Sequence, residues 1–199
     1  MRKLLFGFSL SLLLLSCAND PKTIVVMSKG AAAIDVNAGT IQSKDGSGHE
    51  EKTLNINSKK VSFKLNTPVG EATVEMLDNG LYVVNVKNDT IIGSYQKYSK
   101  ADKVQNVLTQ EVLKQKIDSL ILLSEGKNVS VENRNFFILP NQATKITNNA
   151  AAQVVGPYHQ MRSAEMIDGK EPEIYRFYSI KEIREMIVKL QALTVAPKE

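Results

Sequence analysis

The chain has 199 residues, of which 23% are charged and 6% aromatic, and a formal net charge of +4. Positive and negative side chains are mixed along it without a basic block, so the sequence lacks the positive surface that nucleic-acid binding requires. We therefore expect no nucleic-acid partner. The single cysteine, Cys17, cannot form an intramolecular disulfide.

The start of the chain has the pattern of a secretory signal. Arg2 and Lys3 precede an apolar run that ends at the small residue Ser16. This run has about a dozen residues, whereas a helix needs about twenty to cross the hydrocarbon core of a bilayer. We therefore expect a cleaved signal peptide over residues 1–16 and no permanent transmembrane helix.

The end of this segment resembles the lipobox of bacterial lipoproteins. In that motif an aliphatic residue lies three positions before an obligatory cysteine and a small residue directly before it, and Leu14, Ser16 and Cys17 match these positions. The resemblance implies that cleavage falls between Ser16 and Cys17, and that Cys17 carries a diacylglycerol thioether and an N-acyl chain. Two or more acyl chains anchor a protein stably to a lipid membrane. An unmodified cysteine in an ordinary signal sequence is the alternative.

Residues 17–22 are expected to be the lipidated cysteine and a short polar tether. In lipoproteins of bacteria with two membranes, an aspartate directly after the cysteine often signals retention in the inner membrane. That position is Ala18 here, which favours the outer membrane of the cell envelope. Asn19 and Asp20 also resemble part of a surface-export signal of Bacteroidota lipoproteins, so the periplasmic face and the cell surface both stay open.

Alternating apolar and polar residues predict antiparallel β-structure over residues 23–98. Val61, Phe63 and Leu65 alternate with polar neighbours, as in a strand with one buried face. The Asn-Gly pair at 79–80 lies between two apolar runs and predicts a hairpin, because both central residues of a type I′ turn need positive φ. Short strands separated by regular turns predict a meander or a sandwich-like sheet.

A change of period predicts a long amphipathic helix over residues 99–126. Ser99 resembles an N-cap, and Gly126 lies where a left-handed C-terminal residue belongs. About 24 helical residues would form a rod about 36 Å long, enough to cover the sheet. A partner-binding or coiled-coil helix is the alternative. The predicted apolar stripe consists of Val104, Val107, Leu108, Val112, Leu113, Ile117, Leu120 and Ile121.

The remaining segments complete a predicted α+β fold. Residues 127–158 have β character and predict a small hairpin lobe, with Phe136 and Phe137 as core anchors. Residues 159–178 are polar and predict a loop that could lie over a site.

The last predicted element is an amphipathic helix over residues 179–195. Ser179 and Glu182 fit a capping box. We expect its apolar face to dock on the domain's own core, and a partner groove or a membrane interface is the alternative. The apolar face consists of Ile180, Ile183, Met186, Ile187, Leu190 and Leu193.

Candidate catalytic and metal-binding residues are few, and we expect no cofactor. A Ser-His-Asp enzyme needs a histidine as its base, and only His49 and His159 are present. His159 is a weak catalytic candidate, with Asp168 or Glu165 as an acid. His49 lies in an acidic turn and is a weak metal candidate, but no calcium-loop or zinc spacing surrounds it, so a solvated turn is the main expectation.

Two short motifs resemble O-glycosylation acceptors. Thr90 and Ser119 each follow an aspartate and precede an aliphatic residue, as in the acceptor motif of Bacteroidota envelope proteins. Three-residue patterns also arise by chance, and Ser119 lies within a predicted helix. Chance occurrence is therefore the main expectation for both residues.

The body of the chain resembles, in general character, the Asn- and Lys-rich β-domains of uncharacterised Bacteroidota envelope lipoproteins. No functional family is indicated. The expected function is that of a membrane-anchored envelope lipoprotein, a non-catalytic module that binds an envelope protein or a glycan or supports an assembly. A hydrolase with a site near His159 and a small-ligand binder are the alternatives.

Overall fold

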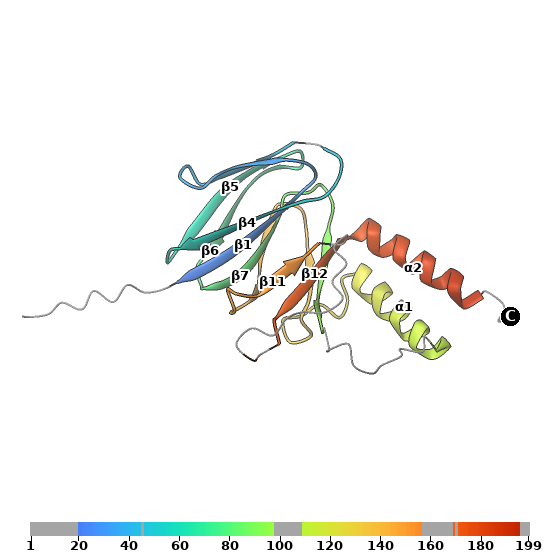
Figure 1. Cartoon of the computed structure of the whole chain (residues 1–199). Coiled ribbons are helices and arrows are strands. Elements are labelled where there is room, and N and C mark those ends of the chain that lie inside the picture. The colour runs from blue at the N-terminus through green and yellow to red at the C-terminus, as the bar shows by residue number, and fades with distance from the viewer. Residues whose placement is uncertain (1–19, 45, 98–108, 157–168, 170, 196–199) are drawn as a thin grey trace, which may run out of the picture.

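The computed structural model describes residues 20–44, 46–97, 109–156, 169 and 171–195. Within these residues the chain forms three four-stranded sheets and two helices (Figure 1). The α+β class predicted from the sequence is confirmed. Cys17, Ser16 and His159 lie outside the described residues.

The first sheet, sheet A, has the strand order β10-β7-β1-β4. β1 is parallel to β7 and antiparallel to β4. Ile24 and Val26 face one side of β1, Val25 and Met27 face the other, and all four are buried. A continuous apolar run is what a strand with two covered faces requires. The strands are β1 (Pro21–Ser28), β4 (Glu50–Asn57), β7 (Gly80–Asn85) and β10 (Gln142–Thr147).

The second sheet, sheet B, has the strand order β2-β3-β5-β6, with β3 parallel to β5. The predicted alternation of β5 is found: Val61, Phe63 and Leu65 are buried, and the intervening Ser62 and Lys64 are exposed. Sheet B therefore has one apolar face and one polar face. Its strands are β2 (Ala32–Asp35), β3 (Thr40–Ser43), β5 (Val61–Thr67) and β6 (Gly70–Met76).

The third sheet, sheet C, has the strand order β11-β12-β8-β9, with β11 parallel to β12. Phe136 and Phe137 are neighbours on β9 and point to opposite faces, each into a different apolar cluster. Both therefore act as core anchors, as predicted. The strands are β8 (Ile91–Gln96), β9 (Asn135–Ile138), β11 (Gln153–Val155) and β12 (Ile174–Ser179).

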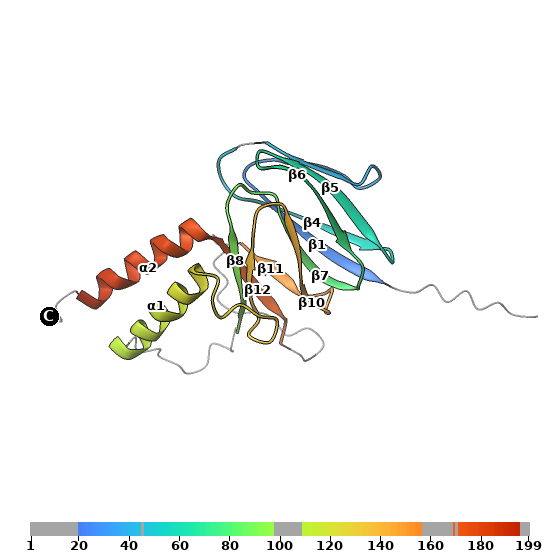
Figure 2. The same ribbon diagram turned by 180° about the vertical axis from the view of Figure 1, so that it is seen from behind.

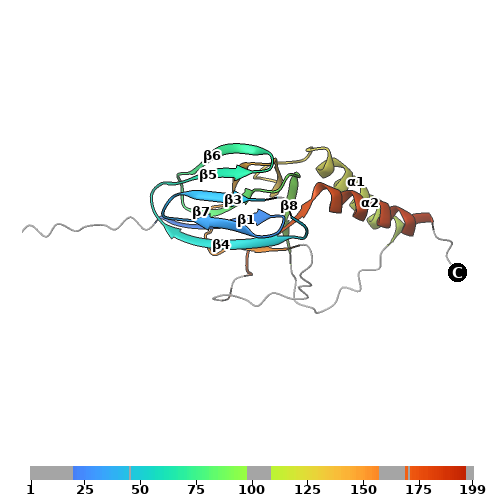
Figure 3. The same cartoon turned by 90° about the horizontal axis from the view of Figure 1, so that it is seen from above.

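The sheets and helices form successive layers. One apolar cluster fills the space between sheets B and A, and a second joins sheet A to sheet C. A third joins the other face of sheet C to helices α1 (Gln110–Ser124) and α2 (Ile180–Val195). The helices thus lie at the end of the molecule opposite sheets A and B (Figures 2 and 3).

The two helices differ in how well the sequence predicted them. The helix predicted over 99–126 begins later in the described residues, at Gln110, where the Thr109 side chain accepts from Val112 N. Residues 99–108, which include the predicted cap Ser99, lie outside the described part of the chain. The predicted left-handed residue Gly126 is found, with φ of +69°. α1 is therefore a short helix paired with α2 and not a rod across the sheet.

The capping box of α2 is found as predicted. The Glu182 side chain accepts from Ser179 N at 2.7 Å, and Glu182 N donates to Ser179 Oγ at 3.2 Å. These two bonds satisfy backbone and side-chain groups at the helix start, where the backbone N–H groups have no partner within the helix. Ile183 and Ile187 are buried, whereas Leu193, predicted on the same face, is 58% exposed.

The prediction that residues 23–98 are antiparallel was wrong in part. The pairs β1–β4, β2–β3 and β5–β6 are antiparallel, but β1–β7 and β3–β5 are parallel. A parallel pair needs a long crossover, which is usually a helix. Here the β1–β7 crossover consists of the strands of sheet B and of β4, so no helical period marks it. The hairpin predicted at 79–80 was also wrong, because β6 belongs to sheet B and β7 belongs to sheet A.

Three other segment predictions were wrong in part. The hairpin lobe predicted over 127–158 does not form a separate unit. β10 pairs with β7 in sheet A, whereas β9 pairs with β8 and β11 pairs with β12 in sheet C. The loop predicted over 159–178 ends at Ile174, where the buried strand β12 begins. The tether predicted over 17–22 ends before Pro21, the first residue of β1.

Candidate functional site

Ionisable side chains gather at one edge of sheet A. The parallel strands β1 and β7 end at this edge, and the antiparallel strand β4 begins there, with Glu50 opposite Ser28. His49 precedes β4 directly, and Lys87 lies two residues after the end of β7. The topology therefore brings together two residues that are 38 positions apart in the sequence.

Glu51, His49 and Lys87 form a hydrogen-bonded chain, here called the Glu51–His49–Lys87 chain. His49 Nε2 lies 2.6 Å from Glu51 Oε1, and Lys87 Nζ lies 2.6 Å from His49 Nδ1. A lysine ammonium can only donate, so Nδ1 accepts, and the proton of the neutral imidazole is on Nε2, which donates to the carboxylate. In this arrangement a neutral histidine links a cation to an anion.

The chain is largely shielded from water. The side chains of His49 and Glu51 are 11% and 20% exposed, and Lys87 is 5% exposed. Burial lowers the pKa of Lys87, and the nearby carboxylates of Glu182, Glu51 and Asp89 oppose this shift. Glu182 belongs to the first turn of α2, so the helix contributes charge to the edge of the sheet.

Backbone and amide contacts fix the position of Lys87. The side chain of the fully buried Asn85 accepts from Lys87 N at 3.0 Å and donates to Asp89 O at 2.8 Å and to Ile138 O at 3.0 Å. Asn85 thus holds the turn that follows β7 against sheet C. These contacts fix the backbone of Lys87, from which its side chain reaches His49.

Gly156 covers the other side of the chain. A Cβ atom at this position would lie 2.8 Å from Glu51 Oε1 and 3.4 Å from His49 Nε2. The absence of a side chain at Gly156 leaves room for the end of the Glu51 side chain. The segment that follows, with the catalytic candidate His159 and its possible partners Glu165 and Asp168, lies outside the described residues.

The geometry limits what His49 can do. Both imidazole nitrogens already contact protein groups, so a metal ion or a substrate would have to displace Lys87 or Glu51. In the described part of the chain, no three His, Cys, Asp or Glu side chains are grouped as metal ligands. The expectation of a solvated turn at His49 was wrong, since the side chain is mostly buried.

The remaining predicted residues lie apart from this chain. Thr90 is half-buried directly before β8, and its carbonyl oxygen accepts from Ile180 N at 2.9 Å. Ser119 is exposed on α1. The sequence placed Glu51 in the same acidic turn as His49 but did not indicate Lys87, whose only signal was its position at the end of an apolar run.

Comparisons of the chain with protein-family models, with curated proteins and with solved structures found no match.

Proposed function

We propose that the protein is a lipid-anchored lipoprotein of the cell envelope whose β-rich body is a non-catalytic binding or assembly module. The observation that carries this proposal is how soon the fold begins after the lipobox. Asp20 N donates to Asn57 Oδ1 at 3.0 Å, and only two residues separate Asp20 from Cys17. Because an extended chain spans about 3.5 Å per residue, the body would be held within about 10 Å of the acylated residue.

The first strand is well suited to hold an anchored body. Lys22 is 1% exposed, and its ammonium donates to the carbonyl oxygens of Ser58 and Lys59 in the turn between β4 and β5. β1 pairs with β4 over eight residues and with β7 over six. The anchor would therefore connect to the central part of sheet A and not to a frayed terminus.

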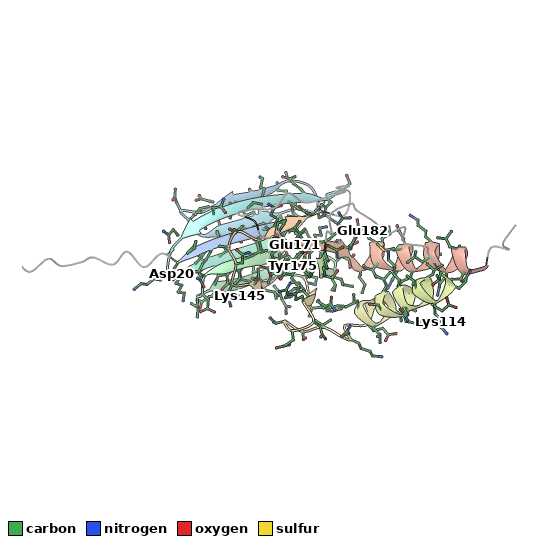
Figure 4. All side chains as sticks on the ribbon, turned by 60° about the horizontal axis from the view of Figure 1, so that its bottom comes forward. Asp20, Lys114, Lys145, Glu171, Tyr175 and Glu182 are labelled. Carbon is green, nitrogen blue, oxygen red and sulfur yellow. The ribbon has the colours of Figure 1, made fainter. Side chains whose placement is uncertain are left out.

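Asp20 and the helix pair lie at opposite ends of the molecule (Figure 4). A molecule anchored through Cys17 would thus present α1 and α2 away from the membrane, where an envelope protein or glycan could be met. Neither helix of the described chain is long and apolar enough to cross a membrane. For the fold, we propose that sheets A and B form the expected sandwich-like unit, which their shared apolar cluster supports.

The proposal is tested by replacing the lipidated residue. Cys17→Ala is expected to abolish incorporation of a labelled fatty acid and to move the protein from the membrane fraction to the soluble fraction. Ser16→Ala is the matched control, because it keeps a small residue before the cysteine and should stay acylated. Membrane association of Cys17→Ala that survives a high-salt wash would contradict the proposal.

Outer-membrane location is tested separately by density-gradient separation of the two membranes. The protein is expected to sediment with the outer membrane, and Ala18→Asp is expected to shift it towards the inner membrane. An unchanged distribution of Ala18→Asp would show that the residue after the cysteine does not sort this protein. Proteolysis of intact cells would then distinguish the cell surface from the periplasmic face.

A further inference from the structure

A polar depression of about 400 Å³ lies beside β10 and β12, apart from the Glu51–His49–Lys87 chain. Segments distant in sequence form it: the turn before β9, the end of β10, and the start of β12. Its lining residues are Val131, Glu132, Arg134, Lys145, Ile146, Thr147, Asn148, Glu173 and Tyr175. Two irregular features of the backbone meet here.

The first irregular feature is a bulge in β10. The pairing of β10 with β7 changes register between Lys145 and Thr147, and residues 145–148 line the depression. The Ile146 side chain is buried in the core between sheets A and C. Bulges are over-represented next to functional sites. Gly80 has φ of +126° and lacks the Cβ that would collide with Thr147 O, so β7 can follow the bulge.

The second irregular feature is the backbone of Arg134. Its φ of +53° is in the left-handed region, and the other described residues with positive φ are glycines or the asparagines Asn128 and Asn141. Asparagine tolerates this region, but arginine does so at a cost. The Arg134 carbonyl oxygen accepts from Tyr95 N at 3.0 Å, and its guanidinium lies 4.5 Å from the centre of the Tyr95 ring. Backbone strain of this kind is concentrated at functional positions.

A fixed carboxylate lies in the same depression. Glu173 accepts from the Tyr175 hydroxyl at 2.6 Å, from Thr147 Oγ1 at 3.2 Å and from Asn149 Nδ2 at 3.2 Å. Three donors hold the carboxylate in one orientation and leave it lone pairs for a further donor. Burial and the neighbouring Glu173 raise the pKa of Tyr175, so its hydroxyl remains a donor at neutral pH.

The opposite charges around the depression do not neutralise one another. In the described residues no ion pair joins Arg134 or Lys145 to Glu173, and Lys145 pairs only with Asp78, at 3.4 Å. Lys145 and Tyr175 are labelled in Figure 4. The site therefore offers fixed positive and negative groups that face one hollow but remain apart.

We propose that this depression binds a small zwitterion, a free amino acid or a short peptide, with its carboxylate on Arg134 and its ammonium on Glu173. A guanidinium can hold a carboxylate through two parallel hydrogen bonds. Lys145 also lines the depression, with its ammonium 3.4 Å from the Asp78 carboxylate. The proposal specifies the binding role proposed above, but it does not depend on the lipid anchor.

Two other ligand classes fit less well. A simple anion would meet the repulsion of Glu173 and of Glu132, whose own backbone N–H and the Ser130 hydroxyl lower its pKa and keep it charged. A sugar is usually bound against an aromatic face. Here Tyr175 is 1% exposed, and Arg134 covers the face of Tyr95.

The test is calorimetric titration of the full chain in detergent with each of the common amino acids, with alanyl-alanine and with glucose, up to about 10 mM. At least one zwitterion is expected to bind. Its N-acetylated form and its amide, which lack the ammonium and the carboxylate respectively, are expected to bind at least about tenfold more weakly. Failure of every zwitterion to bind, or equal binding of the blocked forms or of glucose, would overturn the proposal.

Variants assign the binding to this depression. Arg134→Gly removes the guanidinium and suits the left-handed backbone, and Glu173→Gln removes the charge but keeps the shape. Each is expected to weaken binding at least about tenfold. The control Lys64→Gln removes one charge from the polar face of sheet B and should bind as the natural chain does. Unchanged binding by Arg134→Gly or Glu173→Gln would place the ligand elsewhere. Neither result affects acylation of Cys17, so this proposal and the anchoring proposal fail separately.

Discussion

The Glu51–His49–Lys87 chain and the depression at Arg134 and Glu173 use the same kinds of side chain in opposite ways. In the first, a buried cation and an anion are linked through a neutral imidazole. In the second, cation and anion are each fixed by their own neighbours and do not pair. In the first arrangement the charged groups interact with each other through His49 at the end of sheet A. In the second they stay available to a ligand. Substitutions in the two regions should therefore affect different properties.

The largest effect is expected from His49→Leu, which interrupts the Glu51–His49–Lys87 chain. It would leave the buried Lys87 ammonium and the Glu51 carboxylate without their shared partner, and breaking a buried charge pair costs about 3 kcal/mol. Urea unfolding would measure the loss in the free energy of unfolding. Arg134→Gly, in the other region, is the control. A loss below about 1 kcal/mol for His49→Leu would show that the chain does not hold the fold.

A smaller effect is expected from Ser179→Ala at the start of α2. The substitution removes the N-cap acceptor of the Glu182 N–H and should cost about 1 kcal/mol. Thermal unfolding would measure the change. Ser119→Ala, on the exposed surface of α1, is the control and should leave the stability unchanged. Equal effects of the two substitutions would mean that the capping box does not stabilise α2.

Arg134→Gly should change stability by less than about 1 kcal/mol. Relief of the left-handed strain favours the variant, and loss of the contact with the Tyr95 ring opposes it. The free energy of unfolding would be measured alongside zwitterion binding. A stable variant that no longer binds would sharpen the contrast between the two regions, whereas a loss above about 2 kcal/mol would make Arg134 a structural residue.

The smallest effects at neutral pH belong to two groups that titrate at alkaline pH. The folded pKa of Lys87 lies below its ordinary value of 10.5, so the unfolded chain binds more protons between these values and stability should rise with pH through that window. The folded pKa of Tyr175 lies above 10.0, so stability should fall as the pH rises beyond 10. Urea midpoints measured against pH should lose the rise in Lys87→Met and the fall in Tyr175→Phe. Unchanged profiles would contradict these assignments.

The sequence predicted local structure well where the signal was local. The alternation in β5 and the capping box of α2 depend on residues within a few positions of one another, and both are found. The anchors Phe136 and Phe137 were also correct: Phe136 is buried, and Phe137 is partly buried against the helices. Their partners were not predictable, because the two faces of β9 meet different layers that the chain reaches only after long crossovers.

The two candidate regions could not be predicted for physical reasons. A polar residue directly after an apolar strand is also typical of an exposed turn, so the sequence does not indicate that Lys87 is buried. Only the parallel pairing of β1 with β7 brings it to His49. The sequence does not indicate the left-handed backbone of Arg134, because arginine usually adopts negative φ. Both regions depend on tertiary contacts between segments that are distant in the sequence.

The position of β1 has a mechanical consequence. If Cys17 is anchored as proposed, any force between the membrane and a partner at the helix end enters the protein along β1. The hydrogen bonds to β4 and β7 lie on both sides of this strand and across the direction of pull, so they must yield together and not one after another. The force would therefore load β1, the strand nearest the anchor, in shear.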